Sequence, residues 1–118
     1  LFISGGCSSC FESEIGIWNK LFLNLQNSKQ VKAEVLAVNM GLNDEKMLYY
    51  LKSNQIIFPV LKDDGTYKEL FKDFHGWEVI AFLVDENLRI MKVHLSERSD
   101  VGRTIDFTNK IKKFLIDQ

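Results

Sequence analysis

The sequence has little of several features that define protein classes. It contains one proline and two cysteines in 118 residues, and 15 basic and 16 acidic side chains leave a formal net charge of −1. No apolar run reaches the roughly 18 to 20 residues that a membrane-spanning helix requires. Two cysteines cannot build a disulfide framework. Because the charges balance, we expect no nucleic-acid partner. These absences favour an ordinary soluble globular domain.

The length and composition predict one domain over residues 1–118. Hydrophobic residues make up 46% of the chain and charged residues 26%, which is ordinary for a globular protein. The chain is long enough for a single core and too short for two domains of ordinary size. Because an apolar, strand-like run begins at Leu1, we expect the domain to be trimmed at its N-terminus.

Hydrophobic periodicity predicts alternating strands and helices. The expected strands are residues 1–4, 31–38, 56–61, 79–84 and 88–94, and the expected helices are residues 11–25, about three turns after Asn43, residues 66–74, and a last helix from about Asp100. The fold class is therefore α/β, in the order β-α-β-α-β-α-β-β-α, with a mixed sheet that has helices on both faces. We expect residues 35–38 to form a central strand that is covered on both faces.

Individual side chains in these elements have expected places. Asn43 is the predicted N-cap of the second helix. The expected buried stripes are Phe11, Ile15, Trp18, Phe22 and Leu25 in the first helix, Met47, Leu48 and Leu51 in the second, and Val101, Ile105, Thr108, Ile111 and Leu115 in the last. Glu12 and Glu14 are expected among the polar residues that lie between the apolar residues of the first stripe. His94 is expected on the surface of an edge strand. Asn87 suits a positive φ in the hairpin turn.

The strongest chemical signal is the stretch Cys7-Ser8-Ser9-Cys10, between a predicted strand and a predicted helix. A thiol reacts as its thiolate, and an ordinary cysteine with a pKa of about 8.5 is only about 3% ionised at pH 7. The start of a helix favours the anion by about 1 to 2 kcal/mol, which lowers the pKa by about one unit. The spacing therefore predicts that Cys7 attacks a disulfide and that Cys10 resolves the mixed disulfide.

Three other interpretations of these residues remain open. A zinc site needs about four ligands, and the remaining histidines, His75 and His94, match no zinc-finger spacing, so we expect no metal. In the second interpretation, the two cysteines only fill space near the start of a helix. The third interpretation is peroxidase activity, because Ser4 stands three residues before Cys7, as a hydroxyl residue does in peroxiredoxins.

The motif and the later segments together resemble the thioredoxin-like superfamily. The resemblance rests on residues 2–10, 35–38, 58–63 and 81–90, and the last of these reads A-F-L-V-D-E-N-L-R-I. The chain is most similar to the TlpA and ResA type of bacterial thiol-disulfide oxidoreductases, which are relatives of the AhpC/TSA redoxins. The resemblance implies a thioredoxin-like fold over nearly the whole chain.

The resemblance also implies the residues that meet a partner. These are Gly6, Trp77, Glu78 and Val79. The chain departs from the family pattern at three positions: Gly6 replaces a tryptophan, Ile15 lies near the place of a helix proline, and Val79 stands where a cis-proline is usual. A cis bond before valine would cost about 3 kcal/mol or more, so we expect a trans bond between Glu78 and Val79.

The implied function is thiol-disulfide oxidoreduction with the redox-active pair Cys7 and Cys10. The implied partners are protein thiols or disulfides, with no organic cofactor, in the bacterial periplasm or cell envelope. A membrane tether outside the given chain is compatible with this. The alternative function is a non-catalytic thioredoxin-like module for binding or redox sensing, in which the disulfide is structural or vestigial.

Overall fold

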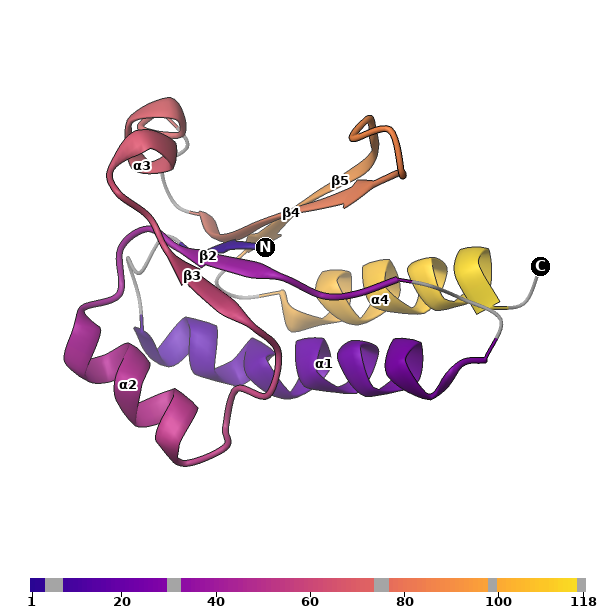
Figure 1. The fold of residues 1–118 in the computed structure, drawn as a ribbon, viewed down its shortest axis with the longest axis horizontal. Coiled ribbons are helices and arrows are strands. Elements are labelled where there is room, and N and C mark those ends of the chain that lie inside the picture. Colours follow the sequence, from indigo (N-terminus) through magenta and orange to yellow (C-terminus); the bar gives the residue numbers. More distant parts are fainter. Residues whose placement is uncertain (4–7, 30–32, 74–76, 98–99, 117–118) are drawn as a thin grey trace.

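The fold consists of one sheet with helices packed against it (Figure 1). The computed structural model describes residues 1–3, 8–29, 33–73, 77–97 and 100–116. The elements in chain order are β1 (Phe2–Ile3), α1 (Ser8–Asn27), β2 (Ala37–Asn39), α2 (Asp44–Lys52), β3 (Val60–Lys62), α3 (Thr66–Leu70), β4 (Trp77–Val84), β5 (Ile90–Glu97) and α4 (Val101–Ile116).

The sheet is mixed, and β1 lies at its centre. The strand order is β3-β2-β1-β4-β5. β1, β2 and β3 run parallel to one another, whereas β4 is antiparallel to both β1 and β5. The predicted α/β class with a mixed sheet is therefore confirmed. The predicted position of β5 at the edge is also confirmed, since β5 ends the sheet.

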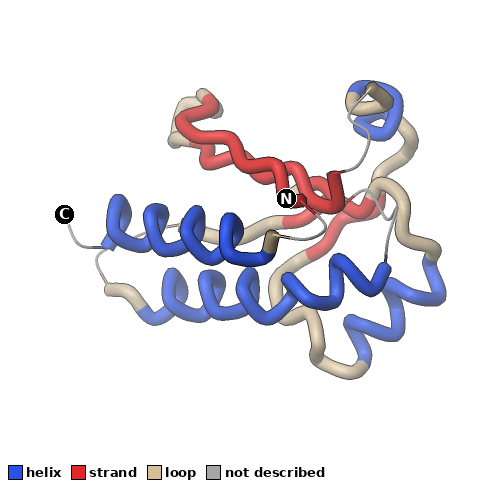
Figure 2. Tube along the Cα trace, turned by 180° about the vertical axis from the view of Figure 1, so that it is seen from behind, coloured by secondary structure: helices blue, strands red, loops and turns tan. Residues whose placement is uncertain are grey.

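The two faces of the sheet are covered differently. α1 and α4 lie side by side along one face, and α3 lies on the other side of the sheet (Figures 1 and 2). Successive residues of a strand point to opposite faces. Ile3 is accordingly fully buried in the core, whereas the ring of Phe2 contacts Tyr67 and Phe71 at the α3 side. We call the α1–α4 side the packed face and the opposite side the open face.

The predicted stripe of α1 is confirmed in the packed face. All five of its apolar residues are buried: Phe11, Ile15, Trp18, Phe22 and Leu25. A stripe at spacings of three and four turns one side of a helix toward the sheet. The edge of Trp18 faces Phe107, which fixes the position of α4 beside α1.

The expectation for α2 is confirmed at its cap and wrong in its buried stripe. Oδ1 of Asn43 accepts a hydrogen bond from the backbone N–H of Lys46 at 2.7 Å, as an N-cap does. The buried residues of α2 are Met47 and Tyr50, whereas Leu48 and Leu51 are exposed. The helix is rotated because the ring of Tyr50 packs edge-on against that of Phe11.

Three further expectations are wrong. The positive φ of the hairpin turn lies at Leu88, with a value of 62°, and not at Asn87, because Oδ1 of Asp85 accepts the backbone N–H of Asn87. In α4, Ile105 is exposed and Thr104 is buried in its stead, since α4 turns its threonines toward β5 and α1. The expected strand at residues 35–38 is not fully covered on both faces, because Leu36, just before β2, is exposed and Val38 of β2 is only partly buried.

Candidate functional site at the start of helix α1

The predicted site residues fall into three groups. Cys7 and Gly6 lie outside the described residues, as do Ser4 and His75, on which the peroxidase and zinc interpretations depend. The backbone of Cys10 is described as the third residue of α1, and those of Trp77 and Glu78 open β4, but these three side chains are outside the description. Val79 is described in full.

The start of α1 lies near the carboxyl end of the central strand. Only residues 4–7 separate Ile3, the last residue of β1, from Ser8, the first residue of α1. A chain of that length spans at most about 19 Å. In the sequence, Cys7 directly precedes Ser8, so the C-x-x-C motif overlaps the first turn of α1. In α/β sheets, the carboxyl ends of parallel strands are where ligands commonly bind.

The position of Val79 is close to this chain segment. Val79 pairs with Ile3, the residue at which the chain leaves β1. The side chain of Val79 is fully buried, and its backbone N–H donates to Oγ of Ser96 at 2.9 Å. The described residues contain no cis peptide bond, so the bond between Glu78 and Val79 is trans, as expected. The predicted contacts of Trp77, Glu78 and Val79 with a partner stay predictions.

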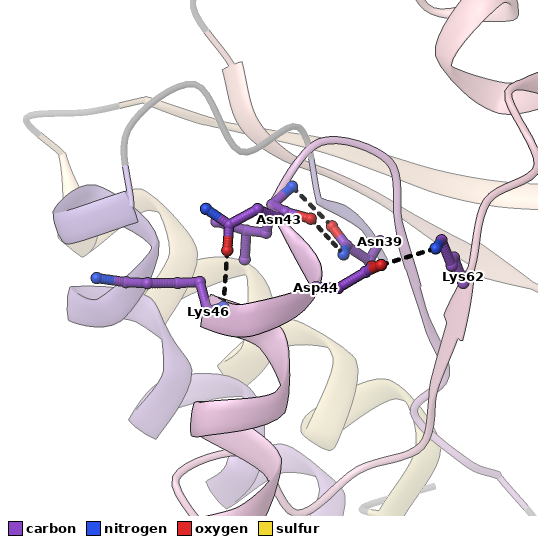
Figure 3. A network of polar contacts seen from close by, with 6 residues as sticks. Asn39, Asn43, Asp44, Lys46 and Lys62 are labelled. Carbon is purple, nitrogen blue, oxygen red and sulfur yellow. Dashed lines mark hydrogen bonds and ion pairs between the residues drawn. The ribbon is translucent and has the colours of Figure 1, made fainter.

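The loop between β2 and α2 starts at the same edge of the sheet. The backbone N–H of Met40 donates to the carbonyl of Ile3 at 2.9 Å, which holds the end of β2 to the end of β1. Asn39 then closes the loop: its amide nitrogen donates to the carbonyl of Leu42 at 2.8 Å, and its Oδ1 accepts the N–H of Leu42 at 2.9 Å (Figure 3). Because Asn39 is buried and bonded twice to one residue, this loop has a fixed path.

An ion pair joins the far end of this loop to the sheet edge. Nζ of Lys62 in β3 lies 2.9 Å from Oδ2 of Asp44, the first residue of α2 (Figure 3). Both side chains are largely exposed, so the pair contributes at most about 1 kcal/mol. The start of α2 is thus held mainly by Asn39 and by the N-cap Asn43.

A buried carboxylate lies in α1, one turn after Cys10. Glu14 is only 2% exposed, which corrects the expectation that it is a polar residue outside the buried stripe. Its Oε1 accepts a hydrogen bond from Nε1 of Trp18 at 3.3 Å and one from Oγ1 of Thr104 in α4 at 3.2 Å. Glu14 is buried because it occupies the same side of α1 as Trp18 and finds these donors there.

The hydrogen bonds continue from Thr104 to β5. Nε2 of His94 lies 2.8 Å from Oγ1 of Thr104. A hydroxyl group has one proton, and Thr104 donates it to Glu14, so Nε2 of His94 carries the proton and donates to Thr104. His94 is 6% exposed and its ring stacks on that of Phe107, so the expected surface position of His94 is wrong. We call Glu14, Trp18, Thr104 and His94 the buried polar network.

The electrostatics of this network favour a neutral imidazole. Burial lowers the pKa of His94 below its ordinary value of 6.5, and the nearby charge of Arg103 lowers it further. At the start of α1, the first turn contains no acidic residue, so no side-chain charge there offsets the partial positive charge of the helix end.

Sequence reasoning identified the cysteines but missed the buried polar network. One signal was available: Glu14 stands three residues after Phe11 and four before Trp18, which is the spacing of the buried stripe. No comparable signal marks His94 or Thr104, because their contact with Glu14 joins residues 90 positions apart in the chain.

In the described part of the chain, no group of three or more histidine, cysteine or acidic residues is arranged to hold a metal ion. No described helix is long and apolar enough to cross a membrane. No model of a known protein family matches the sequence, and no curated protein is significantly similar to it.

Proposed function

We propose that the chain is a thiol-disulfide oxidoreductase in which Cys7 attacks and Cys10 resolves. One observation carries this proposal: the C-x-x-C motif overlaps the first turn of α1, directly after the central strand β1. A cysteine at a helix start gains thiolate character from the helix dipole and from free backbone N–H groups. The two-residue spacing lets the second sulfur reach the first.

A thioredoxin-like fold is part of the same proposal. Its support is that a parallel β1–β2 pair, joined through α1, is followed by an antiparallel β4–β5 hairpin beside β1 and by a last helix packed on α1. The resemblance of the sequence to the TlpA and ResA type adds a bacterial envelope location and protein thiols or disulfides as partners. Trp77 and Glu78 would then meet the partner, whereas the side chain of Val79 is fully buried.

The reaction has two exchange steps. The Cys7 thiolate attacks one sulfur of a partner disulfide, that S–S bond breaks, and the other partner sulfur leaves as a thiolate. Cys10 loses its proton and attacks the Cys7 sulfur, which forms the Cys7–Cys10 disulfide and releases the second partner sulfur. Two electrons pass to the partner, and the reverse sequence oxidises a partner dithiol.

Glu14 is the residue assigned to the proton of Cys10 in this scheme. It stands four residues after Cys10 in α1, and residues at that spacing are neighbours on one side of a helix. Its carboxylate is a buried acceptor that is already bonded to Trp18 and Thr104. A buried base at this spacing would favour deprotonation of the resolving thiol at the moment of attack.

The test combines alkylation kinetics with disulfide reduction. The alkylation rate of Cys7 is followed against pH, with Cys10→Ser used to isolate the Cys7 thiol, and insulin reduction is measured for the unaltered chain and for Cys7→Ser. We expect an alkylation midpoint about one unit below the ordinary 8.5 and insulin reduction that Cys7→Ser abolishes. A midpoint at or above 8.5 together with no disulfide reduction would favour the non-catalytic binding or sensing module.

A further inference from the structure

The carboxyl group of Glu14 lies inside the packed face, where its ionised form is costly. The side chain is buried between α1 and α4, which run side by side along the sheet (Figure 1). Removing a carboxylate from water favours its neutral, protonated form. A protonated Glu14 has no place for the proton of Cys10. The role assigned to Glu14 therefore requires surroundings that keep its carboxylate charged.

Two hydrogen-bond donors from different helices meet at one oxygen of this carboxylate. Nε1 of Trp18 lies 3.3 Å from Oε1 of Glu14, and Oγ1 of Thr104 lies 3.2 Å from the same atom. An indole nitrogen can only donate, and a hydroxyl group can donate or accept. Hydrogen bonds are stronger when the acceptor is ionised, so they favour the charged form. The two donors thus oppose the effect of burial on Glu14.

His94 orients the hydroxyl group of Thr104. The protonated Nε2 of His94 lies 2.8 Å from Oγ1 of Thr104 and donates to it, which leaves the hydroxyl proton free to point at Glu14. The imidazole ring is itself held by stacking on Phe107, with 4.7 Å between ring centres. Hydrogen bonds in series polarise one another and strengthen the last bond of the chain. Both bonds of this chain are therefore directed toward Glu14.

The charged groups of the neighbouring elements leave this direction intact. Burial lowers the pKa of His94, and the charge of Arg103 in α4 lowers it further, so the imidazole is neutral near pH 7 and keeps one ring proton for Thr104. In β4, the described side chains 79–84 are uncharged. In α2, the hydroxyl group of Tyr50 donates to Glu12. Thr104 is accordingly the described side chain through which α4 and β5 act on Glu14.

We propose that Thr104, oriented by His94, is a positioning residue that keeps Glu14 ionised. This inference rests on the proposed function, in which Glu14 accepts the proton of Cys10 during resolution. In that step the S–H bond of Cys10 breaks and its proton passes to the carboxylate. The Cys10 sulfur then bonds to the sulfur of Cys7, and the partner sulfur leaves with the electron pair of the mixed disulfide bond. Thr104 and His94 keep their own protons and touch no reacting atom.

Substitutions at two buried threonines of α4 test this role. Thr104→Val keeps the branched shape and removes the hydroxyl group, whereas Thr104→Ser restores the hydroxyl group in a smaller side chain. Thr108→Val is the matched control, because Thr108 is also buried but donates to the carbonyl of Ile105 in its own helix. Trp18→Phe removes the other donor to Glu14 and provides an independent variant if Thr104→Val does not fold. Circular dichroism checks folding.

Three measurements read the carboxylate and the two thiols separately. Carbon-13 NMR follows the titration of the Glu14 carboxyl group directly. The resolving step is followed by the release of thionitrobenzoate from a mixed disulfide at Cys7, which Cys10 attacks, over a series of pH values. The alkylation rate of Cys7 against pH reports on the proposed function alone.

We expect the titration midpoint of Glu14 to rise by about one pH unit in Thr104→Val, because a hydrogen bond to the ionised form is lost. The acid limb of the release profile should move upward with it. Thr104→Ser should restore both values, Thr108→Val should leave both unchanged, and Trp18→Phe should act like Thr104→Val.

Unchanged profiles in Thr104→Val, or an equal shift in Thr108→Val, overturn the inference even if Cys7 alkylates with a lowered midpoint and the proposed function holds. If Cys7 alkylates with an ordinary midpoint and no thionitrobenzoate is released by Cys10, the proposed function fails, and with it the role of Glu14 in resolution. The NMR titration distinguishes these two failures, since it reads the effect of Thr104 on Glu14 without the thiols.

Discussion

The two faces of the sheet differ in what covers them, although the same strands form both. The packed face buries the stripe of α1 and a polar network from three elements, in which Glu14, Thr104 and His94 bond to one another. On the open face, α3 covers the rings of Phe2 and Phe82, and other hydrophobic side chains lie in solvent. Burial in the packed face therefore supplies most of the stability, whereas the open face supplies less.

Adjacent residues of β1 provide the most direct test of this difference. Ile3 is fully buried against the packed face, and its neighbour Phe2 points to the open face. Ile3→Ala removes buried methyl groups and leaves a cavity, so we expect the free energy of unfolding to fall by about 3 kcal/mol. Phe2→Ala removes the larger side chain but loses partly exposed ring contacts, so we expect a loss of about 1.5 kcal/mol.

The measurement is urea unfolding of both variants, followed by tryptophan fluorescence. We therefore expect the smaller side chain, Ile3, to contribute more to the free energy of unfolding than the larger Phe2. An equal or larger loss for Phe2→Ala would mean that α3 buries the open face as fully as α1 and α4 bury the packed face.

The buried polar network gives the second prediction. Glu14→Ala leaves the N–H of Trp18 without this acceptor and opens a cavity, so we expect a loss of about 2 kcal/mol. Glu14→Gln keeps an acceptor oxygen for Trp18 and Thr104, and we expect less than half of that loss. Urea unfolding of the two variants measures the difference. If Glu14→Ala unfolds at the same urea concentration as the unaltered chain, the network does not stabilise the packed face.

The parts of the fold that could be predicted from the sequence are those that local patterns determine. The face of α1 follows from a long stripe at helical spacing, and the cap of α2 follows from Asn43 and the acidic residues after it. The α2 stripe could not be predicted because nine residues carry two competing apolar rows. The contact of Tyr50 with Phe11 in a different element selects the row.

The same division applies to the candidate site. The C-x-x-C pair is a local motif, so its position before a helix could be read from residue spacing. His94 was expected on the surface because its neighbours, such as Lys92, are polar. Its burial depends on α4, which packs on β5 and offers Thr104 and Phe107. Such contacts between distant segments are set by the packing of elements, which periodicity in one element does not contain.

The third prediction concerns pH and has the smallest expected effect, because it depends on one group of the packed face. Burial and the charge of Arg103 lower the pKa of His94 below 6.5 in the folded chain. Between 6.5 and that lowered value, the unfolded chain binds more protons than the folded chain. The free energy of unfolding therefore falls as the pH is lowered below 6.5, and this loss ends below the folded pKa.

The variant His94→Gln isolates this contribution from the carboxyl groups that also titrate in acid. Glutamine keeps a donor for Thr104 and has no proton to gain, so the difference in unfolding free energy between the two proteins is expected to shrink as the pH falls from 7 to 5. Urea unfolding at a series of pH values measures that difference. A difference that stays constant over this range would mean that the imidazole titrates alike in both states, and hence that His94 is open to solvent, as residues of the open face are.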